Sequence, residues 1–374
     1  MALDHVRAYM HFDSLQFSPT DLSHTTGPLF LTRFVTHLCA PTFILLSGTS
    51  AYFIEKRKTI KETSNFLVTR GLWLIVLQMT LIRFAWNFDP LFHFNSSNII
   101  STIGFCMIIL SFLIRFQLKV ILTIGLIMIF GHNALDKISF EQGTLLDVVW
   151  SFLHVKKIFL IGNEFSFSFL YPIIPWAGVM MLGYCLGSLY DYTYSSEKRK
   201  SVMMQIVLSC FILFLSLRFI NAYGDPAPWS FQLEAGKTVM SFFNVEKYPP
   251  SLMFLLLMLG ITFLILSMLE GKTLSRWKPI VVFGNVSLFY YVMHIFAIHV
   301  FALIAVVIAG YPWHTMIFIG SSTQPSPLLK GKFGFSLSQI YLIWISIVVF
   351  LYPFCTMWNS FKSKNKSKWW VSYV

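Results

Sequence analysis

Long apolar stretches recur from one end of this chain to the other, and each is about as long as a bilayer core is thick. Nine complete spans are predicted near residues 30–54, 66–87, 98–115, 118–132, 169–190, 202–222, 250–269, 284–309 and 337–357. Because a bilayer core holds no water to pair the backbone, such stretches favour helices. The stretches are continuous rather than alternating, which excludes a β-barrel. The pattern therefore predicts an all-α, polytopic integral membrane helix bundle that forms a single domain over residues 1–374.

The first apolar segment, residues 1–11, is shorter than the others. Eleven helical residues rise about 1.5 Å each and do not cross a core of roughly 30 Å. We therefore expect a first helix that is truncated, with its true start upstream, and about ten transmembrane helices in all. Between the spans, LLDVVWSFLHV (145–155) has helical spacing of apolar residues and is expected to lie along the membrane interface.

Basic residues gather in alternate loops. The residues concerned are Lys56, Arg57, Lys58, Lys61, Arg70, Arg115, Lys119, Lys198, Arg199, Lys200, Lys272, Arg276, Lys278 and, in the tail, Lys362, Lys364, Lys366 and Lys368. By the positive-inside rule these loops and both termini are cytoplasmic, and residues 12–28 face outside. The net charge of +12 is thus mainly a topology signal. It is spread over several loops, so nucleic-acid binding is not expected.

Ionisable residues cluster in the first two spans. They are Asp4, His5, Arg7, His11, His24, Arg33 and His37. An ionisable side chain at the centre of a membrane helix costs roughly 2.5–3.5 kcal/mol on insertion scales, so such groups are usually functional and face the bundle interior. Asn285 and His294 in the predicted span 284–309 are further candidates for lining a cavity in the bundle interior, with a hydrogen-bonded helix contact as the alternative.

Other chemistries leave little trace in the sequence. The five cysteines all lie in apolar spans without a CxxC pair, which is typical of small buried hydrophobic residues. His294 and His299 stand five residues apart, which is not the spacing of a helical metal pair. There is no P-loop, dinucleotide fingerprint or GxSxG elbow. No metal is expected.

Several segments together resemble a bacterial membrane family related to the catalytic domain of heparan-α-glucosaminide N-acetyltransferase. The similar segments are MALDHVRAYMHF, PTDLSHTTGPLFLTRFVTHLCAPTFILLSGTSAYF, FLVTRGLWLIVLQ, YPIIPWAGVMMLGYCLG, YPPSL and FGNVSLFYYVMHI. The resemblance covers essentially the whole chain. It implies a membrane acyltransferase that takes an acyl group from cytosolic acetyl-CoA, or another acyl-CoA, and transfers it to a sugar on the far side.

The resemblance also suggests catalytic residues. In the wider superfamily the outer end of the first helix often carries the catalytic histidine, and His5 matches that position. In the heparan enzyme that position is asparagine and the catalytic histidine lies in the first loop, where His24, and less well His11, match by location only. The family's Arg-Gly pair would fall before Met1, which agrees with a truncated first helix.

The chemistry of acyl transfer supports the same residues. Transfer from a thioester to a hydroxyl or amine needs a base, and histidine titrates near working pH. Asp4 adjoins His5, but residues i and i+1 of a helix do not face each other, so pairing with Arg33 is an alternative. Asp4, Arg7, Arg33, His37, Asn285 and His294 are the candidate substrate-binding residues. The alternative is that Asp4, Arg7 and Arg33 form structural ion pairs.

Two function classes therefore stay open. The first is an acyl-CoA-dependent N- or O-acyltransferase, acting on an envelope or extracytoplasmic glycan in the bacterial inner membrane. The second is a transporter or flippase with an intramembrane His/Asp/Arg relay, although no internal symmetry of the kind that many transporters show is evident. The expected partners are the sugar acceptor and the lipid bilayer, and homodimer formation is left open.

Overall fold

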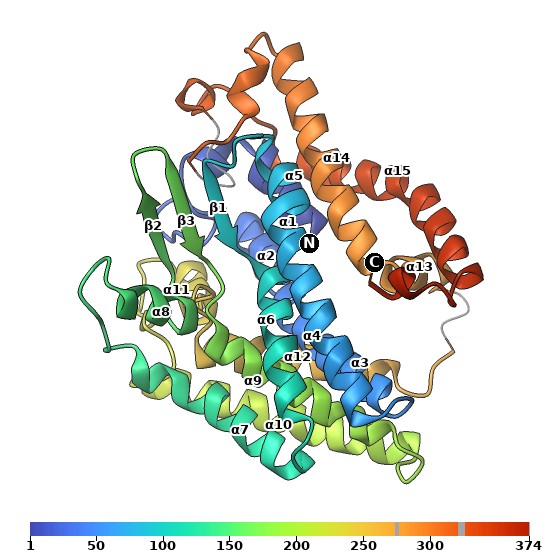
Figure 1. The fold of residues 1–374 in the computed structure, drawn as a ribbon. Coiled ribbons are helices and arrows are strands. Elements are labelled where there is room, and N and C mark those ends of the chain that lie inside the picture. The colour runs from blue at the N-terminus through green and yellow to red at the C-terminus, as the bar shows by residue number, and fades with distance from the viewer. Residues whose placement is uncertain (274–276, 321–325, 374) are drawn as a thin grey trace.

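The computed structural model describes residues 1–273, 277–320 and 326–373, and it is a helix bundle with a small sheet at one end (Figure 1). Among the described residues, eight helical segments are long and apolar enough to cross a membrane. A further apolar helix, α6, has 15 residues. Together these nine segments correspond to the nine complete spans predicted from the sequence, so the all-α membrane bundle is confirmed.

The spanning segments are built from one or two helical elements each. They are α2 (Gly27–Thr36) with α3 (Cys39–Glu55), α4 (Ile60–Leu77) with the π-helical η2 (Gln78–Ile82) and α5 (Arg83–Asn87), α6 (Ile99–Leu113), α7 (Leu118–Gly131) with η3 (His132–Leu135), α9 (Ile173–Gly187) with η4 (Ser188–Tyr190), α10 (Ser196–Ile220), α12 (Leu252–Leu269), α14 (Ser287–Ile308) and α15 (Leu337–Lys364). Shorter helices are α1 (Ala2–Met10), α8 (Leu145–Leu153), α11 (Ala235–Phe243) and α13 (Lys278–Asn285), with 3₁₀ turns η1 (Phe12–Leu15), η6 (Trp313–Met316), η7 (Pro327–Leu329) and η8 (Trp369–Tyr373).

Close contacts between small residues hold the centre of the bundle together. A Cβ atom added to Gly183 of α9 would lie 1.9 Å from the Leu45 carbonyl oxygen of α3, and one added to Gly48 would lie 2.0 Å from the Met180 carbonyl oxygen. The Thr49 hydroxyl then donates a hydrogen bond to the Gly183 carbonyl oxygen at 2.9 Å. Because lipid gives no hydrophobic drive for helix association, close backbone packing of this kind replaces it.

A three-stranded sheet, which the sequence analysis did not predict, covers one end of the bundle. Its strands are β1 (Phe94–Ser97), β2 (Lys157–Ile161) and β3 (Phe165–Phe169), in the order β1-β3-β2. β1 pairs in parallel with β3, which forms an antiparallel hairpin with β2. The predicted helix at 145–155 is present as α8, beside the sheet in Figure 1.

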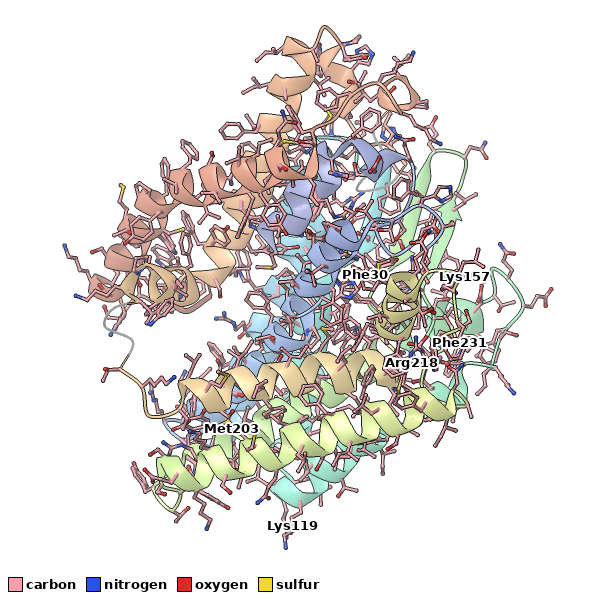
Figure 2. All side chains as sticks on the ribbon, turned by 180° about the vertical axis from the view of Figure 1, so that it is seen from behind. Phe30, Lys119, Lys157, Met203, Arg218 and Phe231 are labelled. Carbon is pink, nitrogen blue, oxygen red and sulfur yellow. The ribbon has the colours of Figure 1, made fainter. Side chains whose placement is uncertain are left out.

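The basic loops meet at the opposite end of the bundle. Lys56 forms a salt bridge with Asp191 at 3.1 Å, which joins the α3–α4 loop to the α9–α10 loop. Arg199 pairs with Glu270 at 2.6 Å and so joins the start of α10 to the end of α12. In Figure 2, Lys119 lies toward the end of α10 that carries Met203, and Lys157 of the sheet lies toward the end that carries Arg218. The bundle thus has a basic end and a sheet end.

The α3–α9 contact gives a test of the packing. Because its Cβ would meet backbone rather than a flexible side chain, Gly183→Ala should destabilise the bundle by about 1–3 kcal/mol. The measurement is the thermal unfolding midpoint of the detergent-solubilised protein. Gly236→Ala in α11, where an added Cβ meets nothing within 4 Å, is the matched control. Equal midpoints for the two variants would contradict the packing described here.

Candidate active site

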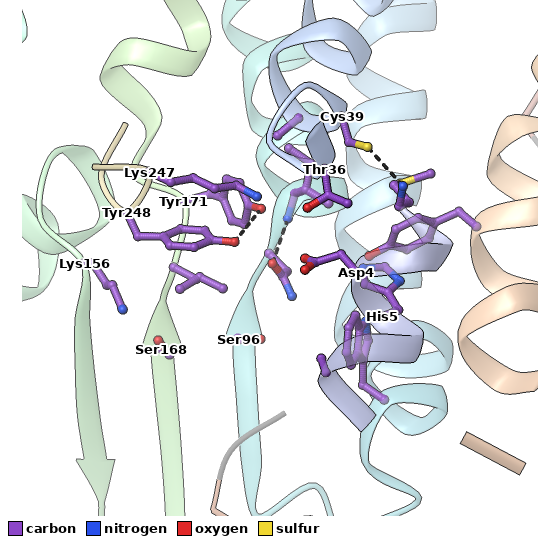
Figure 3. Close-up of a pocket in the computed structure, with 18 of the residues that line it drawn as sticks. Asp4, His5, Thr36, Cys39, Ser96, Lys156, Ser168, Tyr171, Lys247 and Tyr248 are labelled. Atoms are coloured by element: carbon purple, nitrogen blue, oxygen red, sulfur yellow. Dashed lines mark hydrogen bonds between the residues drawn. The ribbon is translucent and has the colours of Figure 1, made fainter. Parts of the chain in front are cut away.

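A cavity of about 420 Å³ lies between the N-terminal helices α1, α2 and α3 and the sheet (Figure 3). Its walls come from α1, α2, α3, all three strands, the loop before α12, and α14. The ionisable side chains that line it include Asp4, His5, Arg7, Arg33, Lys156, Lys247 and Tyr248. A volume of this size is typical of small-molecule sites. Helix α1 therefore brings candidate catalytic residues to a cavity. Loops at the sheet end close this cavity.

Helix α1 is fixed in this position by contacts along its whole length. The Tyr9 hydroxyl donates to the Trp86 carbonyl oxygen at 2.6 Å, and the Phe335 N–H donates to the Met10 carbonyl oxygen at 2.8 Å. Near its start, the Asp4 carboxylate pairs with Arg33 of α2 and, at 3.0 Å, with Arg7 one turn along α1. All three side chains are largely buried. Asp4 is thus paired with arginines, as the structural alternative required, and does not hydrogen-bond His5.

His5 is instead bound by a second histidine. Its Nδ1 lies 2.8 Å from Nε2 of His294 on α14, and the two rings are stacked with centroids 4.9 Å apart and an interplanar angle of 7°. Nδ1 of His294 lies 2.7 Å from the Tyr290 carbonyl oxygen. The edge of the Trp86 ring packs on His5 with centroids 4.7 Å apart. The candidates at positions 5 and 294, which are far apart in the sequence, are therefore in direct contact.

The direction of these hydrogen bonds assigns the tautomers. A carbonyl oxygen only accepts, so Nδ1 of His294 must carry the hydrogen that it donates to Tyr290. In a neutral His294 ring, Nε2 then accepts, so Nδ1 of His5 donates to it. A neutral His5 consequently has its lone pair on Nε2, which has no hydrogen-bond partner among the described residues. Because His5 lines the cavity, this arrangement suits a base.

The long loop between α10 and α12 forms the cavity wall opposite His5. Arg218, at the end of α10, donates to the carbonyl oxygens of Phe242, Ser241, Asn244 and Ala227 at 2.9–3.1 Å. It therefore satisfies carbonyl groups at the end of α11, where a helix leaves its acceptors unpaired. Asp225 accepts from the Glu246 N–H at 3.0 Å and from the Ser251 hydroxyl at 2.7 Å. Residues 246–251 are thus held on both sides.

This held segment places Lys247 and Tyr248 at the cavity. The Tyr248 hydroxyl lies 3.3 Å from that of Tyr171, as Figure 3 shows. Burial raises the pKa of Tyr248, but the positive charges of Lys247 and Arg33 oppose this and hold the pKa to about 8. The lowered pKa indicates a positive potential on this side of the cavity.

The histidines of the first loop lie elsewhere. His24 is exposed, with 63% of its side chain accessible, and its Nδ1 lies 2.8 Å from a carboxylate oxygen of Asp21. The hydrogen bonds from Ser23 and His24 lower the pKa of Asp21 to about 2. Nδ1 of His11 accepts the Asp13 N–H at 3.3 Å, which caps the short turn η1. Neither histidine lines the cavity.

The remaining candidates divide in the same way. His37 ends α2 and is buried edge-on to Phe254, and it is not among the lining residues. Asn285 ends the short α13, is exposed, and lies by the C-terminal tail with Lys362. The predicted span 284–309 breaks at Val286, which separates Asn285 from His294 on α14. The structure therefore does not bring Asn285 to the cavity.

Two lining lysines were not identified as candidates from the sequence. Lys156 precedes β2 and Lys247 lies before YPP, both in stretches interpreted only as loops. One feature of the sequence could have pointed to them. Both lysines lie in the long loops that hold fewer basic residues than the alternate loops. No group of three histidine, cysteine, aspartate or glutamate side chains suited to a metal occurs among the residues that the structure describes.

Comparison with known proteins places the chain in a family. No curated protein and no solved structure matches it. Residues 6–223 match the family model for heparan-alpha-glucosaminide N-acetyltransferase, catalytic. The matched part includes Arg7, His24, Arg33 and His37, whereas Asp4, His5, Asn285 and His294 lie outside it. Since more than half of its length fits this model, the chain belongs to the heparan-alpha-glucosaminide N-acetyltransferase catalytic family.

Proposed function

We propose that this protein transfers an acyl group, most simply acetyl, from acyl-CoA to a sugar acceptor, with His5 as the general base. Membership of the acetyltransferase family supports the reaction class. The observation that carries the residue assignment is the histidine pair, because it leaves the lone pair of His5 Nε2 at the cavity. Acceptor and acyl thioester would meet beside this atom.

The two substrates and His5 account for every bond and proton of the proposed transfer. The acceptor amine or hydroxyl gives its proton to Nε2 of His5 while its nitrogen or oxygen bonds to the thioester carbonyl carbon. The carbon–sulfur bond then breaks, and the proton passes from His5 to the departing CoA thiolate. During this cycle His5 becomes an imidazolium whose Nδ1–H still donates to His294. Because Nε2 of the buried His294 only accepts a hydrogen bond here, it stabilises the positively charged ring of His5.

The substrates would arrive from opposite ends. The adenine nucleotide of CoA is too polar to enter a bilayer core, so we place its binding on the basic, cytoplasmic end with the pantetheine arm running inward. The acceptor would approach from the sheet end, where the cavity is lined by Lys156, Ser168 and Tyr248. This assignment makes the protein an integral membrane enzyme with a cytoplasmic C-terminal tail.

Replacing the proposed base tests the mechanism. His5→Ala should lower transfer from labelled acetyl-CoA by roughly 10²–10⁴-fold, because that is the usual contribution of a general base. Folded yield should stay close to that of the unchanged protein, since His5 is only partly buried. His24→Ala is the paired variant and should keep most of the activity. Loss of transfer in His24→Ala alone would move the base to the first loop, and full activity in both variants would refute the assignment.

A second variant tests the role of His294 as a positioning residue. His294→Phe keeps a stacked ring but removes the acceptor for His5 Nδ1, so kcat should fall by roughly 10- to 100-fold with little change in KM for acetyl-CoA. His294→Gln supplies an acceptor oxygen and should recover part of kcat. His314→Phe, an exposed histidine away from the cavity, is the control. Equal kcat in the Phe and Gln variants would argue against tautomer control.

The orientation can be tested by labelling single cysteines in cells. Glu164→Cys, in the β2–β3 turn, should react with a membrane-impermeant maleimide in intact cells because we place the sheet end outside. Lys198→Cys, at the start of α10, should react only after permeabilisation. The five native cysteines supply the background, which is measured in the unchanged protein. The reverse labelling pattern would overturn the proposed sidedness.

A further inference from the structure

The side chains that line the cavity carry unequal charge. Arg7, Arg33, Lys156 and Lys247 are cationic, and Asp4 is the one carboxylate among the lining residues that the structure describes. Asp4 is already shared by the two arginines. Neither lysine forms an ion pair within the described part of the chain. The cavity therefore presents two lysine ammonium groups that nothing in the described structure neutralises.

Lys247 is the more informative of the two. It is only 8% exposed, and its ammonium lies 5.1 Å from the centre of the Tyr248 ring. Lysine is almost never this buried without a partner, because removing its charge from water is costly. The neighbouring Glu246 forms no ion pair with Lys247 among the described residues, and its Oε1 accepts hydrogen bonds from the backbone N–H groups of Lys247 and Tyr248. A ligand that brings an anion would complete this site.

The two lysines flank the same aromatic ring, that of Tyr248. The ammonium of Lys156 lies 5.5 Å from the centre of the same Tyr248 ring. Figure 3 shows Lys247 ending near the Tyr171 and Tyr248 hydroxyls, on the side of the ring that faces Asp4, and Lys156 on the other side of the Tyr248 ring. Their supports differ, because Lys156 precedes a sheet strand and Lys247 lies in the loop held by Arg218 and Asp225. The two positive charges on this wall of the cavity are thus built into the fold.

We propose that the acceptor carries a phosphoryl group, which Lys247 binds, with Lys156 adding positive charge to the same wall, while the reacting sugar atom reaches His5. This inference rests on the proposed function. Lysine binds phosphate as a compact point charge, and a phosphoryl group carries more negative charge than a carboxylate. CoA also carries phosphates, but the lysines lie at the sheet end, away from the basic end assigned to CoA. The acceptor is therefore the source of the phosphoryl group.

The test compares acceptors that differ in one group. Initial rates with acetyl-CoA are measured for glucosamine, glucosamine 1-phosphate, glucosamine 6-phosphate and the corresponding uronic acid. At least one phosphate should have kcat/KM about tenfold or more above that of glucosamine, mainly through a lower KM. Lys247→Met and Lys156→Met should lose this preference, and Lys247→Arg should retain much of it. Lys237→Met removes a cation from α11, outside the cavity, and should change nothing.

Three outcomes would overturn the inference. Equal kcat/KM for glucosamine and both phosphates would exclude a phosphoryl site. Preference for the uronic acid over both phosphates would indicate a carboxylate site. A raised KM for acetyl-CoA in Lys247→Met, with the acceptor KM unchanged, would assign the lysines to CoA.

A binding measurement separates this inference from the proposed reaction. Calorimetry on the full detergent-solubilised chain uses inorganic pyrophosphate as the probe and needs no turnover. The unchanged protein should bind pyrophosphate at least about tenfold more tightly than Lys247→Met, while Lys237→Met binds it normally. Saturating acetyl-CoA should not displace it. Lysine-dependent binding without transfer to any acceptor would reject the acyltransferase but keep the anion site, whereas transfer without such binding would reject the site.

Discussion

The ion pair between Asp4 and the two arginines determines where α1 lies, and the candidate site depends on α1. An unpaired carboxylate in this position would be strongly unfavourable, because breaking a buried pair costs about 3–5 kcal/mol. Asp4 joins α1 to α2 through Arg33 and to its own next turn through Arg7. The same short helix places His5 within hydrogen-bond distance of His294 on α14. The charges of Asp4, Arg7 and Arg33 would be unfavourable if they were unpaired. Paired with one another, they link α1 to α2.

The half of the site at the sheet end comes from segments that do not span the membrane. β1 and β3 are far apart in the chain but pair in parallel, and the loop before α12 lies against them at the cavity. Arg218 and Asp225 hold that loop through backbone groups rather than through its side chains. Sequence changes in this loop could therefore alter the residues that face the cavity while the loop conformation is kept.

Much of the fold could be predicted from the sequence, because apolar stretches of membrane length admit few alternatives to helices. The sheet was not predicted, although KIFLI and FSFSF are rich in strand-forming residues, because its strands have only four or five residues and form no apolar stretch of membrane length. Trp176 lies near the start of the predicted span 169–190, where tryptophan often anchors a helix at the membrane interface, yet it is fully buried beside Tyr171 and Phe254. Aromatic composition near a span end does not reveal whether protein or lipid surrounds the ring.

The candidate site was predictable only in part. The ionisable residues of α1 and α2 stood out by their cost in a membrane, but contacts between segments 289 positions apart leave no local pattern, as with His5 and His294. Lys156 and Lys247 resembled ordinary loop residues until the fold closed the loops over the cavity. Asn285 was grouped with His294 because an uninterrupted apolar stretch hides the break at Val286.

The chain of hydrogen bonds from His5 through His294 ends at the Tyr290 carbonyl oxygen. A relay that carries protons across a membrane needs a group that both accepts and releases a proton at every position, and a peptide carbonyl is not such a group. A proton taken up by His5 therefore has no onward route through His294 and must leave by the cavity face on which it arrived. This geometry makes the histidine pair a local reservoir for one proton, filled and emptied from the same side, rather than one segment of a conducting path.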